Sequence, residues 1–143
     1  MAGLADAIYW IQDQMLAGTT GLPQGIRSAP DYPPETLNVF PAVLTYEGPG
    51  VWKADSAASF TTLYSIVIDL HVARKDMARD LTTLRGLLTT IPMVIVNNPT
   101  LGGNVQTYSQ IDFSGLIALL PSTENQVGTI GYRWTIQGVK IRP

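Results

Sequence analysis

A long alternating segment in the middle of the chain restricts its fold more than any other feature. From 63 to 73 the sequence reads LYSIVIDLHVA, so apolar side chains occupy every even position, whereas Ser65, Asp69 and His71 stand at odd ones. Successive side chains of a β-strand point to opposite faces, so this period of two predicts a long strand. One face of that strand belongs to a core, and we expect the other to meet water or a neighbour.

Two other segments have the spacing of a helix. Apolar residues recur at i, i+4, i+7 and i+11 in 3–17 and again in 77–89, which places them on one helical face. These residues are Leu4, Ile8, Ile11 and Met15 in the first segment and Met77, Leu81, Leu84 and Leu88 in the second. We expect Gly18 to end the first helix and Pro92 to halt the second.

Further strands are expected at 38–46, 105–120 and 129–142. Pro41 either places the first of them at a sheet edge or is its first paired residue, because proline cannot donate a ladder hydrogen bond. In the last strand the apolar parity changes at Gly138, which indicates a β-bulge. Residues 47–61 are bounded by glycine and lack a period, so they predict a loop or a long hairpin arm carrying Trp52 and Phe60.

Together these elements predict one α+β domain over residues 1–143. It has a mainly antiparallel four-stranded sheet, two helices packed on one face and a long hairpin or loop arm.

The composition excludes several classes of chemistry. The chain has no cysteine, which removes disulfides, thiolate catalysis and cysteine metal sites, and His71 is its single histidine. Asp69 and Asp112 stand on separate strands and could be neighbours, but two acids in a sheet are more often solvated or salt-bridged than an acid–base pair. We therefore expect no enzyme, no metal site and no cofactor. His71 is expected to face solvent or an interface.

Charge and hydropathy restrict the partners. The net charge is −2, which leaves no global positive field to attract nucleic acid. The longest apolar runs fall far short of a membrane span, and the first basic residue is Arg27, so we expect neither a membrane segment nor a signal peptide. Only 14% of the residues are charged, which suits either a weakly charged monomer or a surface covered by partners.

Several segments, taken in order, resemble the tail terminator (tail-to-head joining) proteins of long-tailed bacteriophages. They are the N-terminal helix, the proline-rich link into FPAVLTYEGPG, the strand YSIVIDLHVAR running into KDMARDLTTLRGLL, then IPMVIVNNPTLGGNV and GYRWTIQGVKI. The resemblance spans residues 4–141, and the PTLGGNV turn is its most distinctive part.

The resemblance implies a structural subunit of a six-fold (hexameric) ring that caps the tail tube and joins it to the neck or head completion protein. Such a ring belongs to the virion at the head–tail junction after assembly in the host cytoplasm, and DNA passes through its lumen without specific binding. The expected partner contacts lie in the arm and in the PTLGGNV turn. They are Trp52, Lys53, Phe60, Leu101 and Asn104. The acids that could face the lumen are Asp55, Asp69, Asp112 and Glu124.

Two alternatives stay open. The nearer one is another phage neck or tail ring protein, such as a head completion or stopper protein or a tail tube subunit, and gene order would distinguish it. The more distant one is a small-molecule binding domain with a pocket between sheet and helices, favoured if Trp10, Trp52 and Trp134 converge.

Overall fold

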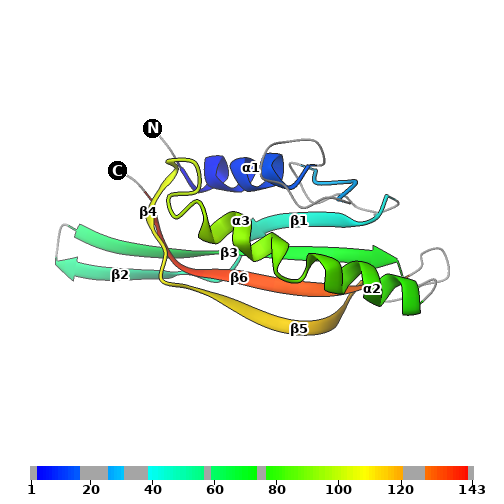
Figure 1. Cartoon of the computed structure of the whole chain (residues 1–143). Helices are drawn as coiled ribbons and strands as arrows, with labels where there is room; N and C mark the ends of the chain where they lie inside the picture. Colours follow the sequence, from blue (N-terminus) through cyan, green and yellow to red (C-terminus); the bar gives the residue numbers. More distant parts are fainter. Residues whose placement is uncertain are drawn as a thin grey trace.

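An antiparallel sheet with helices on one side makes up the described part of the chain (Figure 1). The computed structural model describes residues 3–16, 26–30, 39–56, 59–73, 77–120 and 128–141. The helices are α1 (Leu4–Met15), α2 (Met77–Leu87) and α3 (Thr90–Val96). The strands are β1 (Ala42–Glu47), β2 (Val51–Ser56), β3 (Ser59–Ala73), β4 (Val105–Thr107), β5 (Gln110–Leu120) and β6 (Thr129–Ile141). The fold is α+β.

The alternating segment forms β3, the long strand at the centre of the sheet. β1 pairs with one edge of β3 and β6 pairs with the other, both antiparallel. Ile66, Ile68 and Leu70 are all buried in the core against the helices. The odd positions of β3 therefore point to the face of the sheet opposite the helices, which we call the outer face.

The β-bulge expected in the last strand is confirmed. The register between β3 and β6 shifts between Tyr64 and Ile66, whose partners on β6 are Val139 and Ile136. The extra residue of β6 lies at Gly138, so Ile136 and Val139 are both fully buried although their positions differ in parity.

The sheet has six strands, two more than the four that the sequence predicts. The arm contributes β2, because the segment after Gly50 pairs with the start of β3. The segment 105–120 divides into β4 and β5, which pair with different parts of β6. β1 begins directly after Pro41 and pairs with no other named strand of the described chain besides β3, which confirms its place at an edge.

Helix α1 packs with the stripe that its spacing predicts. Ile8, Ile11 and Met15 are buried in the core, and Leu4 packs against it. Gln12 is also fully buried, where its side chain donates to the carbonyl of Val43 at 3.2 Å and accepts from the hydroxyl of Thr45 at 2.6 Å. Because a buried amide needs such partners, Gln12 fixes α1 against β1.

The predicted stop at Pro92 is wrong. α2 ends at Leu87, and Pro92 lies in the first turn of the next helix, α3. Proline is tolerated there because the first amides of a helix have no intrahelical acceptor. The apolar run that follows Pro92 is helical, and Ile91, Val94 and Ile95 join the core.

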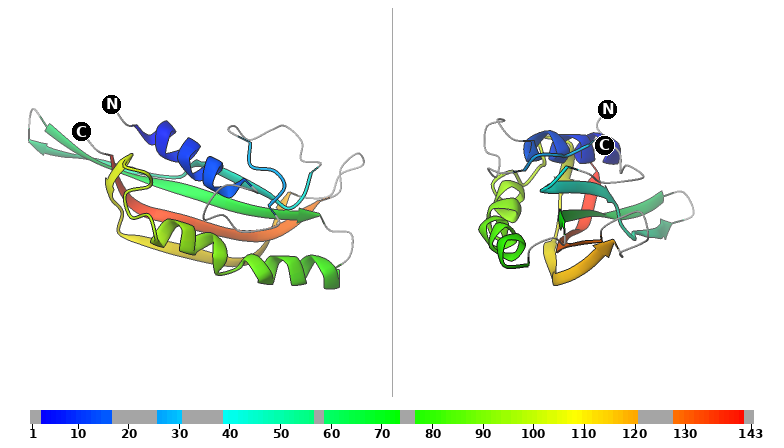
Figure 2. Two further views of the ribbon diagram at one scale, coloured as in Figure 1. Left: turned by 45° about the horizontal axis from the view of Figure 1, so that its top comes forward. Right: turned by 90° about the vertical axis from the view of Figure 1, so that its right-hand side faces the viewer.

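All three described helices contribute to one core on the same side of the curved sheet (Figure 2). α1 covers the end of the sheet at β1, and α2 and α3 lie along the rest of that face. None of the helices in the described ranges is long and apolar enough to cross a membrane.

Candidate functional site

The arm is a two-stranded ribbon that extends beyond the rest of the sheet (Figure 1, left). β1 and β2 run along the same edge of β3, and the register changes between them from the Glu47–Ile66 pair to the Val51–Leu63 pair. Gly50 makes this change possible, since a Cβ there would lie 2.8 Å from the carbonyl oxygen of Leu63. The ribbon starts where pairing with β6 ends, because β6 meets β3 from Tyr64 onward.

Large apolar side chains of the ribbon are open to solvent. Trp52 is 72% exposed, Val51 57% and Leu63 38%. Val51 stands opposite Leu63, and Trp52 stands opposite Thr62 on the other face of the ribbon. Lys53 is exposed beside them. A two-stranded hairpin is only marginally stable by itself in water, so this surface is suited to association.

A second exposed apolar surface lies at the opposite edge of the sheet. It consists of Phe113 and Leu116 on β5, each about half exposed. Met93 and Val96 of α3 are exposed to a similar extent. The ring of Phe113 packs 5.3 Å from that of Tyr132 and 5.6 Å from that of Trp134. Tyr132 and Trp134 are buried, whereas Phe113 stays open because β5 is the last strand of the described sheet on this side.

A polar cluster of three side chains lies on the outer face of the sheet. Asp69 of β3 is 3% exposed and stands opposite Arg133 of β6. Arg133 binds the carboxylate with two donors, Nε to Oδ1 at 2.8 Å and Nη2 to Oδ2 at 3.0 Å. The hydroxyl of Tyr46 on β1 donates to Oδ2 at 2.6 Å and accepts from Arg133 Nη2 at 3.1 Å. The cluster therefore joins three adjacent strands.

The environment of this cluster raises the pKa of both Tyr46 and Arg133. Burial and the hydrogen bond to Asp69 raise the pKa of Tyr46 to about 12, so the phenol stays protonated and donates. The hydrogen bond to Asp69 likewise raises the pKa of Arg133. A buried carboxylate held by a two-donor guanidinium and a phenol is a structural ion pair.

His71 does not face solvent, so that alternative of the sequence prediction is wrong. It is 3% exposed on the outer face of β3, and its Nδ1 lies 2.8 Å from the hydroxyl oxygen of Thr129. Burial lowers the pKa of His71 to about 4, because the charged imidazolium loses its hydration. Nε2 has no hydrogen-bond partner among the described residues. His71 is therefore neutral at neutral pH.

Two of the predicted site residues are buried inside the subunit instead of lying on its surface. Leu101 is fully buried in the core, so its side chain is not available to a partner. Asp69 is occupied by Arg133 and Tyr46, and this excludes it from a solvent-facing lumen surface. The alternation of β3 did not reveal the burial of Asp69, because burial of the outer face depends on neighbouring strands.

The remaining predicted residues have varied positions. Asn104 is half-buried, and its amide donates to the carbonyl of Leu101 at 2.9 Å. Asp112 is exposed and accepts from the amides of Gln110 and Gln137. Asp69 and Asp112 flank β6 on opposite sides and have different partners, so they form no pair. Phe60 lies on β3 opposite Ala54. Glu124 and the side chains of Asp55 and Phe60 lie outside the described residues.

The tryptophans do not converge. Trp10 of α1 lies against Gly102, Trp134 is buried beneath Phe113, and Trp52 projects from the ribbon. This arrangement gives no support to a pocket built from the three indoles. Within the described ranges, no group of three or more His, Asp or Glu side chains is placed to hold a metal ion.

The distinctive PTLGGNV turn has a structural basis. Leu101, Gly102 and Gly103 have φ of 49°, 74° and 86°, all in the left-handed region. A Cβ on Gly102 would lie 2.3 Å from Nε1 of Trp10. The glycine therefore lets the turn pack directly against α1 while Leu101 enters the core.

Sequence reasoning missed Arg133 and Tyr46 as partners of Asp69. A signal was present, because a charged residue in the middle of a long strand needs an opposite charge on the same face of a neighbouring strand. Arg133 stands between the aromatic residues Tyr132 and Trp134 and meets this requirement.

No known family model matches the chain, and no curated protein is significantly similar to it.

Proposed function

We propose that this chain is a structural ring subunit of the tail terminator type. Six copies cap the tail tube of a long-tailed bacteriophage and join it to the neck or head completion protein, and DNA passes through the lumen without specific binding. The chain acts in the virion at the head–tail junction, needs no cofactor and catalyses no reaction. The order of segments that resemble this family over residues 4–141 motivates the proposal.

The observation that carries the proposal is the ribbon formed by β2 and the start of β3. It presents Trp52 with 72% of its surface open, at a place where the subunit itself has nothing to cover it in the described ranges. Aromatic side chains of this kind are typical anchors of protein interfaces. The subunit has a projecting apolar ribbon and a second apolar surface at its opposite edge. Contacts between these two different surfaces on neighbouring copies can repeat from subunit to subunit and close into a ring.

The first test removes the anchor. We expect Trp52→Ala to leave the melting temperature of the subunit nearly unchanged, because the indole has few contacts within it, and to prevent tail completion in phage that carry the variant. Loss of an interface anchor costs about 2 kcal/mol or more, roughly a thirtyfold loss of affinity. Trp52→Phe keeps an aromatic group and should retain most of the function.

Val39→Ala is the matched control, since Val39 is 42% exposed outside the ribbon and its truncation should have no effect on assembly. If Trp52→Ala unfolds the subunit, the indole belongs to the core and the interpretation of the ribbon is wrong.

The second test distinguishes the kinds of ring protein. Phage that lack the chain should yield DNA-filled heads and separate tails that do not join, because the cap between them is missing. Heads that lose their DNA would favour a head completion protein, and a complete absence of tubes would favour a tube subunit. Joined, infectious particles would contradict all three assignments.

A further inference from the structure

Two strand edges on opposite sides of the sheet have no partner in the described chain. Among the described strands, β2 pairs with β3 alone and β5 pairs with β6 alone. Each therefore presents a row of backbone N–H and C=O groups that another strand can bind. The regular parts of both edges have the same length, because the ladder is undisturbed from Val51 to Ala54 and from Gln110 to Phe113.

The side chains along these two edges match face by face. Phe113 stands opposite the core residue Trp134, so it lies on the helix side of the sheet, and Asp112 lies on the outer face. Trp52 stands opposite Thr62, which has the same parity on β3 as the core residue Ile66, so Trp52 also lies on the helix side. Lys53 then lies on the outer face, as Asp112 does.

Strand direction brings both pairs into one register. β2 is antiparallel to β3, β3 to β6, and β6 to β5, so β2 and β5 run in opposite directions within the sheet. If a second copy, related to the first by rotation, continues its sheet, the free edge of β2 in one copy therefore lies antiparallel to the free edge of β5 in the other. If Trp52 then stands opposite Phe113, the next residue, Lys53, stands opposite Asp112.

Each pair is chemically favourable. Trp52 would cover Phe113, which is 48% exposed, and reach the neighbouring Leu116, which is 49% exposed. Lys53 would meet a carboxylate that accepts hydrogen bonds from the neutral amides of Gln110 and Gln137, and no ion pair of the described residues compensates its charge. Aromatic pairs and opposite charges directly across an antiparallel ladder both stabilise it.

We propose that the free edge of β2 pairs with the free edge of β5 in a second copy of this chain, antiparallel, with Trp52 opposite Phe113 and Lys53 opposite Asp112. The inference rests on the proposed ring and names the contact that builds it. The contact joins unlike surfaces, so each subunit uses both edges and the sheet continues around the assembly. It also assigns Asp112 to the interface between subunits instead of the lumen.

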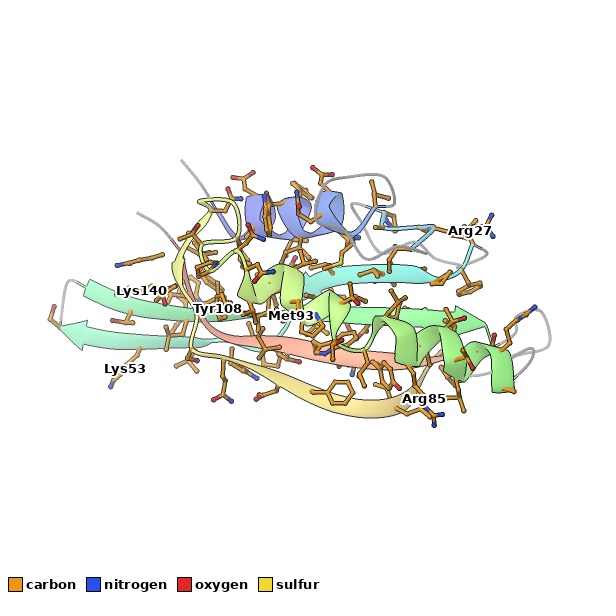
Figure 3. The ribbon with its side chains drawn as sticks, in the orientation of Figure 1. Arg27, Lys53, Arg85, Met93, Tyr108 and Lys140 are labelled. Carbon is orange, nitrogen blue, oxygen red and sulfur yellow. The ribbon has the colours of Figure 1, made fainter. Side chains whose placement is uncertain are left out.

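Cysteine cross-linking tests the register, and the absence of cysteine from the chain removes any background. Residues directly opposite in an antiparallel ladder have Cβ atoms about 4.5–5.5 Å apart, within reach of a disulfide after small adjustments. We expect the purified double variant Lys53→Cys/Asp112→Cys to form a ladder of covalent oligomers on mild oxidation. The control Lys140→Cys/Asp112→Cys should stay uncross-linked, because Lys140 lies on β6 opposite Thr107 of β4 and belongs to neither β2 nor β5 (Figure 3 labels Lys140 and Lys53).

Charge exchange provides a second readout. Lys53→Glu should raise the protein concentration needed for half-assembly about fivefold, and Asp112→Lys should do the same. The double variant Lys53→Glu/Asp112→Lys should restore assembly, because the opposite charges face each other again. Circular dichroism should show equal melting temperatures for all variants, since both side chains are exposed.

The outcomes separate this inference from the proposed function. If the wild-type chain forms rings but neither cross-linking nor charge rescue occurs, the edge pairing is wrong and the ring remains. If the wild-type chain assembles at no concentration, both are wrong. Cross-linking of position 53 to a different protein, with none between copies, would also overturn the edge pairing.

Discussion

Removing Arg133 should destabilise the subunit more than neutralising its partner does. Arg133→Met keeps an apolar stem of similar length but leaves the Asp69 carboxylate, whose side chain is 4% exposed, with the Tyr46 hydroxyl as its remaining described donor. Breaking a buried ion pair costs about 3–5 kcal/mol. The Arg133 side chain is 38% exposed, so water can enter the space it leaves, and we expect the lower end, about 3 kcal/mol.

Asp69→Asn should cost less. The amide keeps the shape of the carboxylate and still accepts a hydrogen bond, and the guanidinium that loses its counter-ion can reach solvent. We expect about 1–2 kcal/mol, the value for a weakened buried hydrogen bond. For a chain of 143 residues, 1 kcal/mol lowers the melting temperature by about 2–4 °C, so Arg133→Met should lower it by about 6–12 °C.

Urea unfolding followed by circular dichroism measures both free energies of unfolding, provided that the slope against denaturant is unchanged. The double variant Asp69→Asn/Arg133→Met should be more stable than Arg133→Met alone, because it contains no uncompensated charge. If Asp69→Asn is at least as destabilising as Arg133→Met, the buried carboxylate is not the limiting charge and the reasoning fails.

Three further outcomes follow from the structure. Gly102→Ala should destabilise the subunit by at least about 1 kcal/mol more than Gly103→Ala, because both glycines have a positive φ but only Gly102 approaches Trp10. Urea unfolding measures both values, and an equal loss of unfolding free energy in the two variants would contradict this. The free energy of unfolding should fall as the pH decreases from 6.5 to 4, by up to about 3 kcal/mol from His71, because burial lowers the pKa of His71 to about 4 and the unfolded chain therefore binds the proton first. Thermal scans of His71→Gln should show a shallower decline with pH. Parallel curves for the variant and the wild type would exclude His71 as the cause. In an assembled ring, Asp and Glu should outnumber Lys and Arg along the lumen, since phosphate-binding cations would retard DNA, and a net basic lining seen by cryo-electron microscopy would overturn this.

The central elements of the fold were predictable because their patterns follow from elementary geometry. A period of two predicts the strand β3, an apolar stripe predicts the amphipathic helix α1, and the parity change at Gly138 predicts a β-bulge. They concern one element at a time, and the core-facing residues of each element pack as its own pattern indicates.

Features that depend on contacts between elements were not predictable in the same way. Pro92 breaks a helix in its interior but suits a first turn, and the choice depends on whether a new helix starts at Thr90. Leu101 is in a turn, which predicts exposure, yet the turn packs against α1 and buries it. Asp69 is buried because Tyr46 on β1 and Arg133 on β6 lie beside it. The sequence of β3 alone does not indicate which strands or residues will be its neighbours.

The candidate site was only partly predictable for a related reason. Trp52 and Lys53 were singled out as large or charged residues in a segment without a period, and both are exposed on the ribbon. Phe113 and Leu116 were read as parts of an ordinary strand. Their exposure becomes visible when β5 is known to be the outermost strand on its side of the sheet.

The mass and symmetry of particles formed by the purified chain test the central claim most directly. Native mass spectrometry over increasing protein concentration, combined with class averages from electron microscopy, should show closed rings of six times the mass of one chain, with a central opening. A particle that remains a single chain at every concentration would contradict the proposed ring subunit. A closed two-fold dimer would also contradict it. In the proposed ring, the β2 edge of each subunit binds the β5 edge of the next, and a closed dimer does not continue in this way.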